Sequence, residues 1–497
     1  MRIALPTMKS CRAGARQRGS ILVVVLWIIF GLISITLYFA NSMTYELRAS
    51  DNRVAGEEAE FAIEAARRYI TCVLSNVNQQ GLLPDGQCYL YKNVAVGNAR
   101  YWLIGRTNNP NVQVSNIVFG LTSEAAKLNL NALPGGRSTA GSNLAFLPRM
   151  TQEIAWNIIA WGATNTQNTV GGAESDAYLM QTPPYNCKNT NYETVEELRH
   201  VLNVTMDMLY GEDANLNGIL DPNENDADNL PPTDNMDGRL DAGLLEWFTI
   251  YSVEPSTDTN GSNRINVVSS GTTGGTTGGT GGGGGGSGVA QQLGNLMSTN
   301  FGTSRTDQIL ANLGLSTNTT GGGGGGGRGA GGGGTTTTAV SLTSPLDMFM
   351  QSQMTMDEFQ VIEPSIRGRN IKGLVDVNQA PAEVLEGLPG MDISKAQQLV
   401  SYRAANWGNL YNRFTVSWVA NVLDYQTIVQ MGPWITGRTF QFGADVAAVG
   451  HDGRGYRRTY FVFDTSAGYP AVVYRQDRTH LGWALGQEVK ADLAKNN

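Results

Sequence analysis

The chain is poor in the residues that enzymes most often use for catalysis. It has 497 residues but only three histidines and four cysteines. The histidines, His200, His451 and His480, are scattered along the sequence. No zinc-binding His-Glu-x-x-His, serine nucleophile elbow or phosphate-binding loop can be found in it. The sequence therefore predicts a protein that is not an enzyme.

The few cysteines also limit cross-linking. Cys11 lies in the basic N-terminal leader, which leaves Cys72, Cys88 and Cys187 for an exported body. An oxidising compartment would allow one disulfide among them, and Cys72 with Cys88 is the pair nearest in sequence. Because spacing does not establish geometry, the paired and unpaired forms both stay open, with Cys187 free if the pair forms.

Acidic residues are missing ahead of Glu46, and this gap defines the N-terminal segment. Five basic residues precede Ser20, and their removal would change the formal net charge from -8 to -13. Residues 21–40 are largely apolar and long enough to span a bilayer. Basic charge ahead of such a segment holds that end in the cytoplasm. A cut between Gly19 and Ser20 would keep the apolar helix, unlike a secretory signal, and this order resembles prepilins with an N-methylation-type leader.

Glycine is concentrated rather than spread. The tracts 271–288 and 321–334 hold 24 of the 61 glycines. Glycine loses more backbone freedom on ordering than any other residue, so we expect a disordered Gly/Thr-rich insertion over 255–345. One or two helical turns are expected within it, from Thr306 to Leu315.

The order of the remaining patterns predicts an α+β fold. A long N-terminal helix, with an apolar stripe at Phe61, Ile63, Ala66, Tyr69 and Ile70, packs on a small antiparallel sheet that a large helical insertion interrupts. The expected divisions are a leader (1–19), the N-terminal helix (20–76), the first part of the sheet (77–125), a first helical region (126–254), the disordered insertion (255–345), a second helical region (346–440) and C-terminal strands that complete the sheet (441–497).

Several blocks, in this order, resemble the minor pseudopilin K family of type II secretion systems. They are the Gly19–Ser20 junction, the KLNLNAL run at 127–133, TIYS at 249–252 with RINV at 264–267, and DVNQAPAEVL at 376–385 with LPGM at 388–391. The resemblance implies a pilin-like N-terminal helix and sheet, and a helical domain of helix-hairpin-helix (SAM-like) character. It also implies a subunit that caps the periplasmic pseudopilus while folded proteins are exported across the outer membrane.

The resemblance further implies where the chain resides and what it contacts. A prepilin peptidase would cut between Gly19 and Ser20, leaving a single-pass inner-membrane protein with its globular part in the periplasm. Implied partners are minor pseudopilins of the I and J types and the inner-membrane assembly platform. Val24, the fifth residue of the mature chain, stands where most pilins carry a glutamate that pairs with a neighbour, and its absence is consistent with a fibre tip.

An acidic loop carries the clearest ligand pattern. Residues 213–224 fit the calcium loop D-x-[DN]-x-[DN]-G-x5-E without a gap. The expected oxygen ligands come from Asp213, Asn215, Asn217, Ile219 (through its carbonyl), Asp221 and Glu224. Ten acids against one base between Glu212 and Glu246 also favour a bound cation over a merely solvated loop.

A second Asx-rich cluster follows, formed by Asp234, Asp237 and Asp241. It lacks a terminal glutamate, because Leu244 occupies that register. The resemblance implies two calcium ions in the helical domain, so a second site is predicted here, with Asp226 and Asp228 able to contribute to either site.

Residues 387–391 between two short helices predict a helical hairpin. In nucleic-acid binders such a hairpin grips phosphate with basic residues beside it, whereas here Glu383, Glu386 and Asp392 surround Lys395. A structural hairpin is favoured, and nucleic acid is not expected as a partner. The alternative function is a minor pilin-like protein of a type IV pilus or DNA-uptake machine, which would use this hairpin on DNA.

Overall fold

The computed structural model describes residues 19–77, 80–106, 117–136, 139–163, 171–227, 229–268, 285–315, 341–406, 408 and 415–495. The predicted leader up to residue 18, most of the first glycine tract and all of the second lie outside the described residues.

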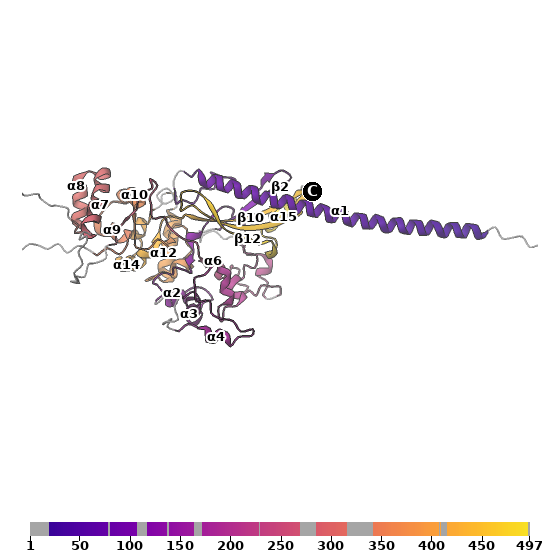
Figure 1. The fold of residues 1–497 in the computed structure, drawn as a ribbon, viewed down its shortest axis with the longest axis horizontal. Helices are drawn as coiled ribbons and strands as arrows, with labels where there is room; N and C mark the ends of the chain where they lie inside the picture. The colour runs from indigo at the N-terminus through magenta and orange to yellow at the C-terminus, as the bar shows by residue number, and fades with distance from the viewer. Residues whose placement is uncertain are drawn as a thin grey trace, which may run out of the picture.

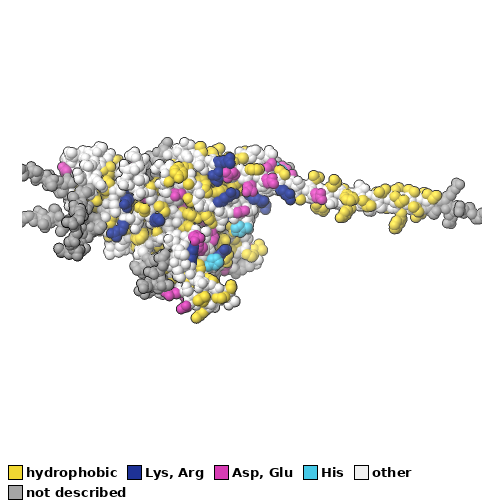
Figure 2. Space-filling view, viewed as in Figure 1, with side chains coloured by type: hydrophobic (Ala, Val, Ile, Leu, Met, Phe, Trp, Pro, Cys, Tyr) yellow, Lys and Arg dark blue, Asp and Glu magenta, His cyan; other side chains and the backbone are white. Residues whose placement is uncertain are grey.

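The N-terminal helix α1 extends from Gly19 to Ser75, a length of 57 residues. Its first half projects away from the body of the molecule (Figure 1). Large hydrophobic side chains from Ile21 to Leu47 are exposed along it, as Figure 2 shows. Among the described residues it is the one helix long and apolar enough to cross a membrane, with a mean hydropathy of 2.7 in its most apolar window. This part of α1 fits a single-pass membrane anchor.

The second half of α1 packs on the sheet through small side chains. A Cβ atom on Gly450 or Gly455 would lie 2.2 or 2.3 Å from the backbone of Ala55, so α1 is in close contact with the turn between β10 and β11. Phe61, expected in the buried stripe, is 71% exposed, because it lies two residues from the buried Ile63 and therefore points to the opposite side of the helix. The buried positions of the stripe are Ala55, Ala59, Ala62, Ile63, Ala66 and Ile70.

The sheet beneath α1 is antiparallel throughout, with strand order β1-β2-β10-β11-β12 and β3 paired to β10. All nine residues of the central strand β10 are buried. α1 covers one face, and a small cluster that includes Trp102 and Leu485 covers the other. The strands are β1 (Val94–Val96), β2 (Ala99–Ile104), β3 (Thr122–Ser123), β10 (Gln441–Val449), β11 (Arg457–Asp464) and β12 (Ala471–Asp477).

The helical body between β3 and β10 has one continuous hydrophobic core, which extends from Leu128 to Ile435 in sequence. Three short parallel strand pairs join segments that are distant in the chain: β4 (Leu128–Asn129) with β5 (Phe248–Thr249), β6 (Ile265–Asn266) with β7 (Ile366–Arg367), and β8 (Val375–Asp376) with β9 (Ile435–Thr436). The two helical regions expected from the sequence therefore share a core.

Most helices of this body are short. They are α2 (Ala140–Leu144), α3 (Gln152–Trp161), α4 (Ser175–Leu179), α5 (Met206–Tyr210), α6 (Leu244–Trp247), α9 (Pro345–Ser352), α10 (Met356–Ile362), α11 (Ala382–Glu386), α12 (Ile393–Ala405) and α14 (Tyr425–Met431). The 3-10 turns η1 (Glu124–Ala126), η2 (Val195–His200), η3 (Pro222–Glu224), η4 (Glu363–Ser365), η5 (Ser417–Asn421) and η6 (Gly432–Trp434) connect them. After β10 come η7 (His451–Gly453), η8 (Thr479–Leu481) and the last helix, α15 (Gly486–Lys495).

The insertion differs from the expectation of disorder over 255–345. Between the glycine tracts the structure has two helices, α7 (Gly285–Phe301) and α8 (Thr303–Asn312), which pack against each other. Apolar residues at helical spacing allow this, since they add to the core of the helical body. The buried ones are Leu293, Met297, Ile309, Leu310 and Leu313. Both helices lie at the end of the body opposite the free part of α1 (Figure 1).

The cysteines differ from the paired alternative. Cys72 and Cys88 are exposed and free, and Cys187 is buried and free. The loop that carries Cys88 docks on α1 through Tyr69, whose hydroxyl accepts the Leu90 N–H at 2.9 Å, rather than through Cys72. The sulfur of Cys72 faces the amide of Asn76, 3.5 Å away.

Candidate metal-binding loop

The loop 213–224 is folded by its own side chains. The Asp213 carboxylate accepts the backbone N–H groups of Asn217 at 2.9 Å and Gly218 at 2.8 Å. Gly218 has φ +75°, a left-handed conformation that suits glycine at the sharp bend of a calcium loop. At the end of the loop, Asp221 and Glu224 form a capping box around η3.

The predicted ligand side chains converge. The amides of Asn215 and Asn217 both donate to Asp221 Oδ2, at 2.7 and 3.0 Å. Glu224 accepts the backbone N–H of Ala214 at 3.2 Å and that of Asp221 at 2.9 Å, so it spans the two ends of the loop. The fold thus brings together all five side chains named from the sequence.

Burial makes these carboxylates costly in the absence of a cation. Asp213 is 3% exposed and Glu224 is 1% exposed. Burial raises the pKa of Asp213 above its ordinary value and raises the pKa of Glu224 to about 8. Asn215 Oδ1 is buried without a hydrogen-bond partner. Buried carboxylates beside an unpartnered amide oxygen form the hard oxygen set that Ca²⁺ prefers.

Carboxylates alone do not define this site. Within the described residues, no group of three His, Cys, Asp or Glu side chains is placed to hold a metal ion. In loop 213–224 the carboxylates are instead bonded to backbone N–H groups and to two side-chain amides. A cation here would therefore be held by amide and carbonyl oxygens as well as by carboxylates.

The second cluster has a different arrangement. Asp234 accepts the backbone N–H groups of Asp226 and Ala227, and Asp237 accepts that of Arg239. Asp241 instead accepts the Asn235 amide at 3.1 Å. These three carboxylates hold separate turns, and Asp228 lies outside the described residues.

Glu212, which the sequence analysis did not select, links the two clusters. It is 1% exposed. Its oxygens accept the backbone N–H of Asn235 at 3.3 Å and that of Asp241 at 3.0 Å, and Arg149 Nη2 is 3.4 Å away. Burial raises the pKa of Glu212. The sequence signal was only the density of acids, which does not rank one above another.

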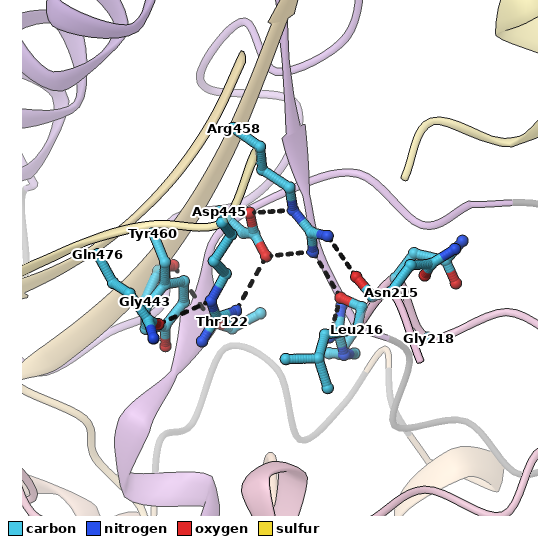
Figure 3. Close-up of polar contacts among 12 residues, drawn as sticks. Thr122, Asn215, Leu216, Gly218, Gly443, Asp445, Arg458, Tyr460 and Gln476 are labelled. Carbon is cyan, nitrogen blue, oxygen red and sulfur yellow. Dashed lines mark hydrogen bonds and ion pairs between the residues drawn. The ribbon is translucent and has the colours of Figure 1, made fainter. Parts of the chain in front are cut away.

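Two arginines, on or next to strands of the sheet, donate hydrogen bonds to backbone carbonyls of the loop. Arg458 on β11 donates from both Nη atoms, to the carbonyl of Asn215 and, at 2.6 Å, to the carbonyl of Leu216 (Figure 3). Arg106, just after β2, donates to the same Leu216 carbonyl at 2.9 Å.

Each of these arginines is paired with a carboxylate. Arg458 Nε and Nη2 bind the two oxygens of Asp445 at 2.8 and 2.7 Å, and the Arg458 side chain has no exposed surface. Arg106 Nε binds Glu246 at 2.9 Å. Burial opposes ionisation of Asp445, but Arg458 holds the pKa of that carboxyl below its ordinary value. The metal loop is therefore fastened to the sheet by charge-assisted hydrogen bonds.

The hairpin between α11 and α12 uses its basic residue internally. Gly390 turns the chain with φ +77°. Lys395 Nζ donates to the Gly390 carbonyl at 3.2 Å and to Thr427 Oγ1 at 2.7 Å. Burial, with Glu383 and Asp392 adding to it, raises the pKa of Glu386, so the surface beside the hairpin is acidic.

Comparison with known proteins agrees with this picture in one region. No curated protein matches the chain significantly. A chain of the crystal structure of the GspK-GspI-GspJ complex from the enterotoxigenic Escherichia coli type 2 secretion system is similar at 9% identity, with a TM-score of 0.38, over 88% of this chain and 98% of that one. Residues 126–210, which end just before the metal loop, match the family described as Type II secretion system (T2SS), protein K. The resemblance of this chain to the protein K family of minor pseudopilins is thereby confirmed.

Proposed function

We propose that the chain is a minor pseudopilin of a type II secretion system that caps the pseudopilus tip during export of folded proteins. The observation that carries this is the protein K match at 126–210, inserted between strands β3 and β10 of the antiparallel sheet on which the 57-residue N-terminal helix packs. Protein K of such a system is a structural subunit, in accordance with the non-enzymatic composition.

The shape of the molecule supports the tip position. A helical body with its own core is inserted between β3 and β10, well to the side of α1 (Figure 1). Subunits stacked above α1 in a fibre would collide with a body of that size. Val24 adds to this argument, because an apolar residue there has no carboxylate with which to pair to a subunit above it.

The same function implies a location and partners. The exposed half of α1 would anchor the chain in the inner membrane, with the globular body in the periplasm. The partners would be minor pseudopilins of the I and J types, the inner-membrane assembly platform and the prepilin peptidase.

The test determines the N-terminus of the full chain extracted from membranes and identifies the proteins that co-purify with it. With the peptidase present, the new terminus should be Ser20, and I-type and J-type pseudopilins should co-purify. Gly19→Val, which adds a branched side chain at the cut, is the control and should stay uncut. An uncut wild-type chain, or one that co-purifies with neither partner, would reduce the proposal to a simple membrane anchor.

Calcium bound to the loop 213–224 completes the proposal. The ligands would be Asp213, Asn215, Asn217, Asp221 and Glu224, with the carbonyl of Ile219. The ion would neutralise two carboxylates that burial makes costly and keep the acidic loop rigid. A second ion at Asp234, Asp237 and Asp241 stays a prediction, and Glu212 would add to it.

Calorimetric titration of chelator-treated protein tests this directly. Because two ligands are neutral amides, we expect saturable binding in the range of about 10⁻⁴ to 10⁻³ M that suits extracellular sites. Mg²⁺ is the control ion, and it should bind more weakly because it demands a tighter octahedral geometry. No binding heat at millimolar Ca²⁺ would remove the metal from the proposal.

Nucleic acid is the rival partner, through the hairpin between α11 and α12. Lys395 already donates to Gly390 and Thr427, and the acidic flank would repel phosphate. We therefore expect no retardation of DNA by the purified protein at physiological salt. Retardation that Lys395→Gln abolishes would favour the DNA-uptake alternative.

A further inference from the structure

The centre of the metal loop holds a residue in a strained conformation. Leu216 has φ +51°, in the left-handed region that a leucine seldom adopts, and its side chain is 6% exposed. This conformation is unfavourable for a non-glycine residue, so other contacts must maintain it. The neighbours of the Leu216 carbonyl show which contacts those are.

That carbonyl accepts two guanidinium groups. Arg458 Nη2 is 2.6 Å away and Arg106 Nη2 is 2.9 Å away, and a further bond from Arg458 reaches the carbonyl of Asn215. Hydrogen bonds from a charged donor are about twice as strong as neutral ones. Two successive peptide groups are thus fixed by the sheet, on either side of the strained residue.

The direction of these peptides sets the direction of the ligands. With their carbonyls turned toward the arginines (Figure 3), the Asn215 and Asn217 side chains meet at Asp221, at 2.7 and 3.0 Å. Without the arginines both carbonyls would lose their charged donors, and the Asn217 N–H bond to Asp213 would be left to orient the second of the two peptides. The ligand positions therefore depend on groups that do not themselves belong to the loop.

Each of the two arginines is paired with a carboxylate, which weakens its repulsion of a cation. Asp445 accepts two bonds from Arg458 and one from Arg478 at 3.2 Å, and Glu246 pairs with Arg106. The loop faces the arginines with the carbonyl oxygens of Asn215 and Leu216.

We propose that Arg458 and Arg106 are positioning residues for the metal loop, and that through them calcium binding and attachment of the loop to the sheet stabilise each other. The inference rests on the proposed calcium site and extends it to residues that hold no metal. Because binding coupling is reciprocal, an attached loop binds calcium more tightly and bound calcium attaches the loop more firmly. Loss of a group that orients metal ligands typically lowers metal affinity about 10- to 100-fold.

The test measures calcium affinity and the melting temperature, with calcium and with chelator, in the peptidase-processed full chain. Arg458→Lys should weaken calcium affinity about tenfold and shrink the rise in melting temperature that calcium produces. Arg106→Gln serves as the second variant, because its side chain is partly exposed and its loss leaves the Arg458–Asp445 pair intact. It should act in the same direction.

Tyr460→Phe is the matched control. Tyr460 lies on the same strand as Arg458 and is buried, but its hydroxyl bonds Glu124 rather than the loop. It should lower both melting temperatures equally and leave calcium affinity unchanged. Arginine variants that behave like this control would overturn the positioning role, while a wild-type chain that binds no calcium would instead overturn the proposed site.

Discussion

The β10–β11 hairpin joins two distant parts of the chain through ion pairs, and the two junctions are built differently. In mid-strand, Asp445 and Arg458 attach the metal loop with side chains that are 4% and 0% exposed. In the turn that follows β10, His451 and Arg454 attach α1 through Asp51 and Glu58, with His451 21% and Asp51 41% exposed. The junction with the metal loop is buried, and the junction with α1 is exposed to water.

The exposed junction has a simple geometry. Nδ1 of His451 is 2.7 Å from Glu58, and Nε2 is 3.1 Å from Asp51. Both ring nitrogens can donate only in the protonated form, so the contact is complete when His451 carries a charge. Arg454 adds a pair to Asp51, and the Glu58 carboxylate also accepts the backbone N–H of His451 at 3.1 Å.

The difference in exposure predicts a difference in strength. Removing one partner of a buried pair leaves an uncompensated charge and costs about 3–5 kcal/mol. An exposed pair contributes about 0.2–1 kcal/mol, because water screens it. The attachment of the metal loop is therefore a fixed feature of the fold, and the attachment of α1 at the turn is adjustable.

The largest expected effect comes from Arg458→Met. It leaves Asp445 buried with only Arg478, and should lower the free energy of unfolding by about 3 kcal/mol. The matched change in the exposed junction, Arg454→Met, should cost less than about 1 kcal/mol. Urea unfolding followed by circular dichroism measures both. Equal losses would show that exposure does not separate the two junctions.

Removal of calcium ligands should have the next largest effect. Asp213→Asn and Glu224→Gln keep the size of each side chain but remove its charge. In calcium at a hundred times the dissociation constant, wild type should gain about 2.7 kcal/mol of stability that the variants lack. In chelator the variants should melt no lower than wild type, because they carry one buried carboxylate fewer. Equal melting temperatures of wild type and the two variants in saturating calcium would show that calcium does not stabilise the metal loop.

A smaller effect is expected from pH at the exposed junction. Its carboxylate partners raise the pKa of His451 above 6.5, and bonds from His451 hold the pKa of Glu58 below 4.5. The His451 contribution is therefore complete below about pH 6.5 and is lost as pH rises through its folded pKa. The Glu58 contribution is present above about pH 4.5 and is lost as pH falls through its folded pKa. The junction should be strongest between these limits.

Comparison of wild type with His451→Gln measures this effect. The difference in melting temperature should be largest between pH 5 and 6 and should shrink toward pH 8. His480→Gln, which replaces a histidine on η8 rather than in the turn after β10, is the control. A difference between wild type and His451→Gln that is constant from pH 5 to 8 would rule out a charged histidine at the turn.

The N-terminal helix and the ligand pattern of the metal loop could be predicted from the sequence, whereas details of the sheet and of the helical body could not. The region 441–497 was predicted to hold strands, but the bounds of β10 could not be read from the sequence, because a strand covered on both faces shows no alternation of polar and apolar residues. The helix α7 was missed because the glycine tracts dominated the composition, and α8 was expected only as one or two helical turns from Thr306 to Leu315. Phe61 was placed on the wrong face of α1, because a residue two positions from the buried Ile63 points to the opposite side of a helix.

The sequence by itself determined the features whose residues all lie within one short segment of the chain. Twenty apolar residues after a basic leader indicate a spanning helix whatever follows, and the ligands at 213–224 are close enough in sequence for one turn to gather them. Only the tertiary structure decided which groups hold that turn in place. Arg458 and Asn215 are 243 positions apart, and Glu58 and His451 are 393 apart. No local pattern links residues so distant, because their contact exists only once the sheet has formed and one junction has been buried while the other stays in water.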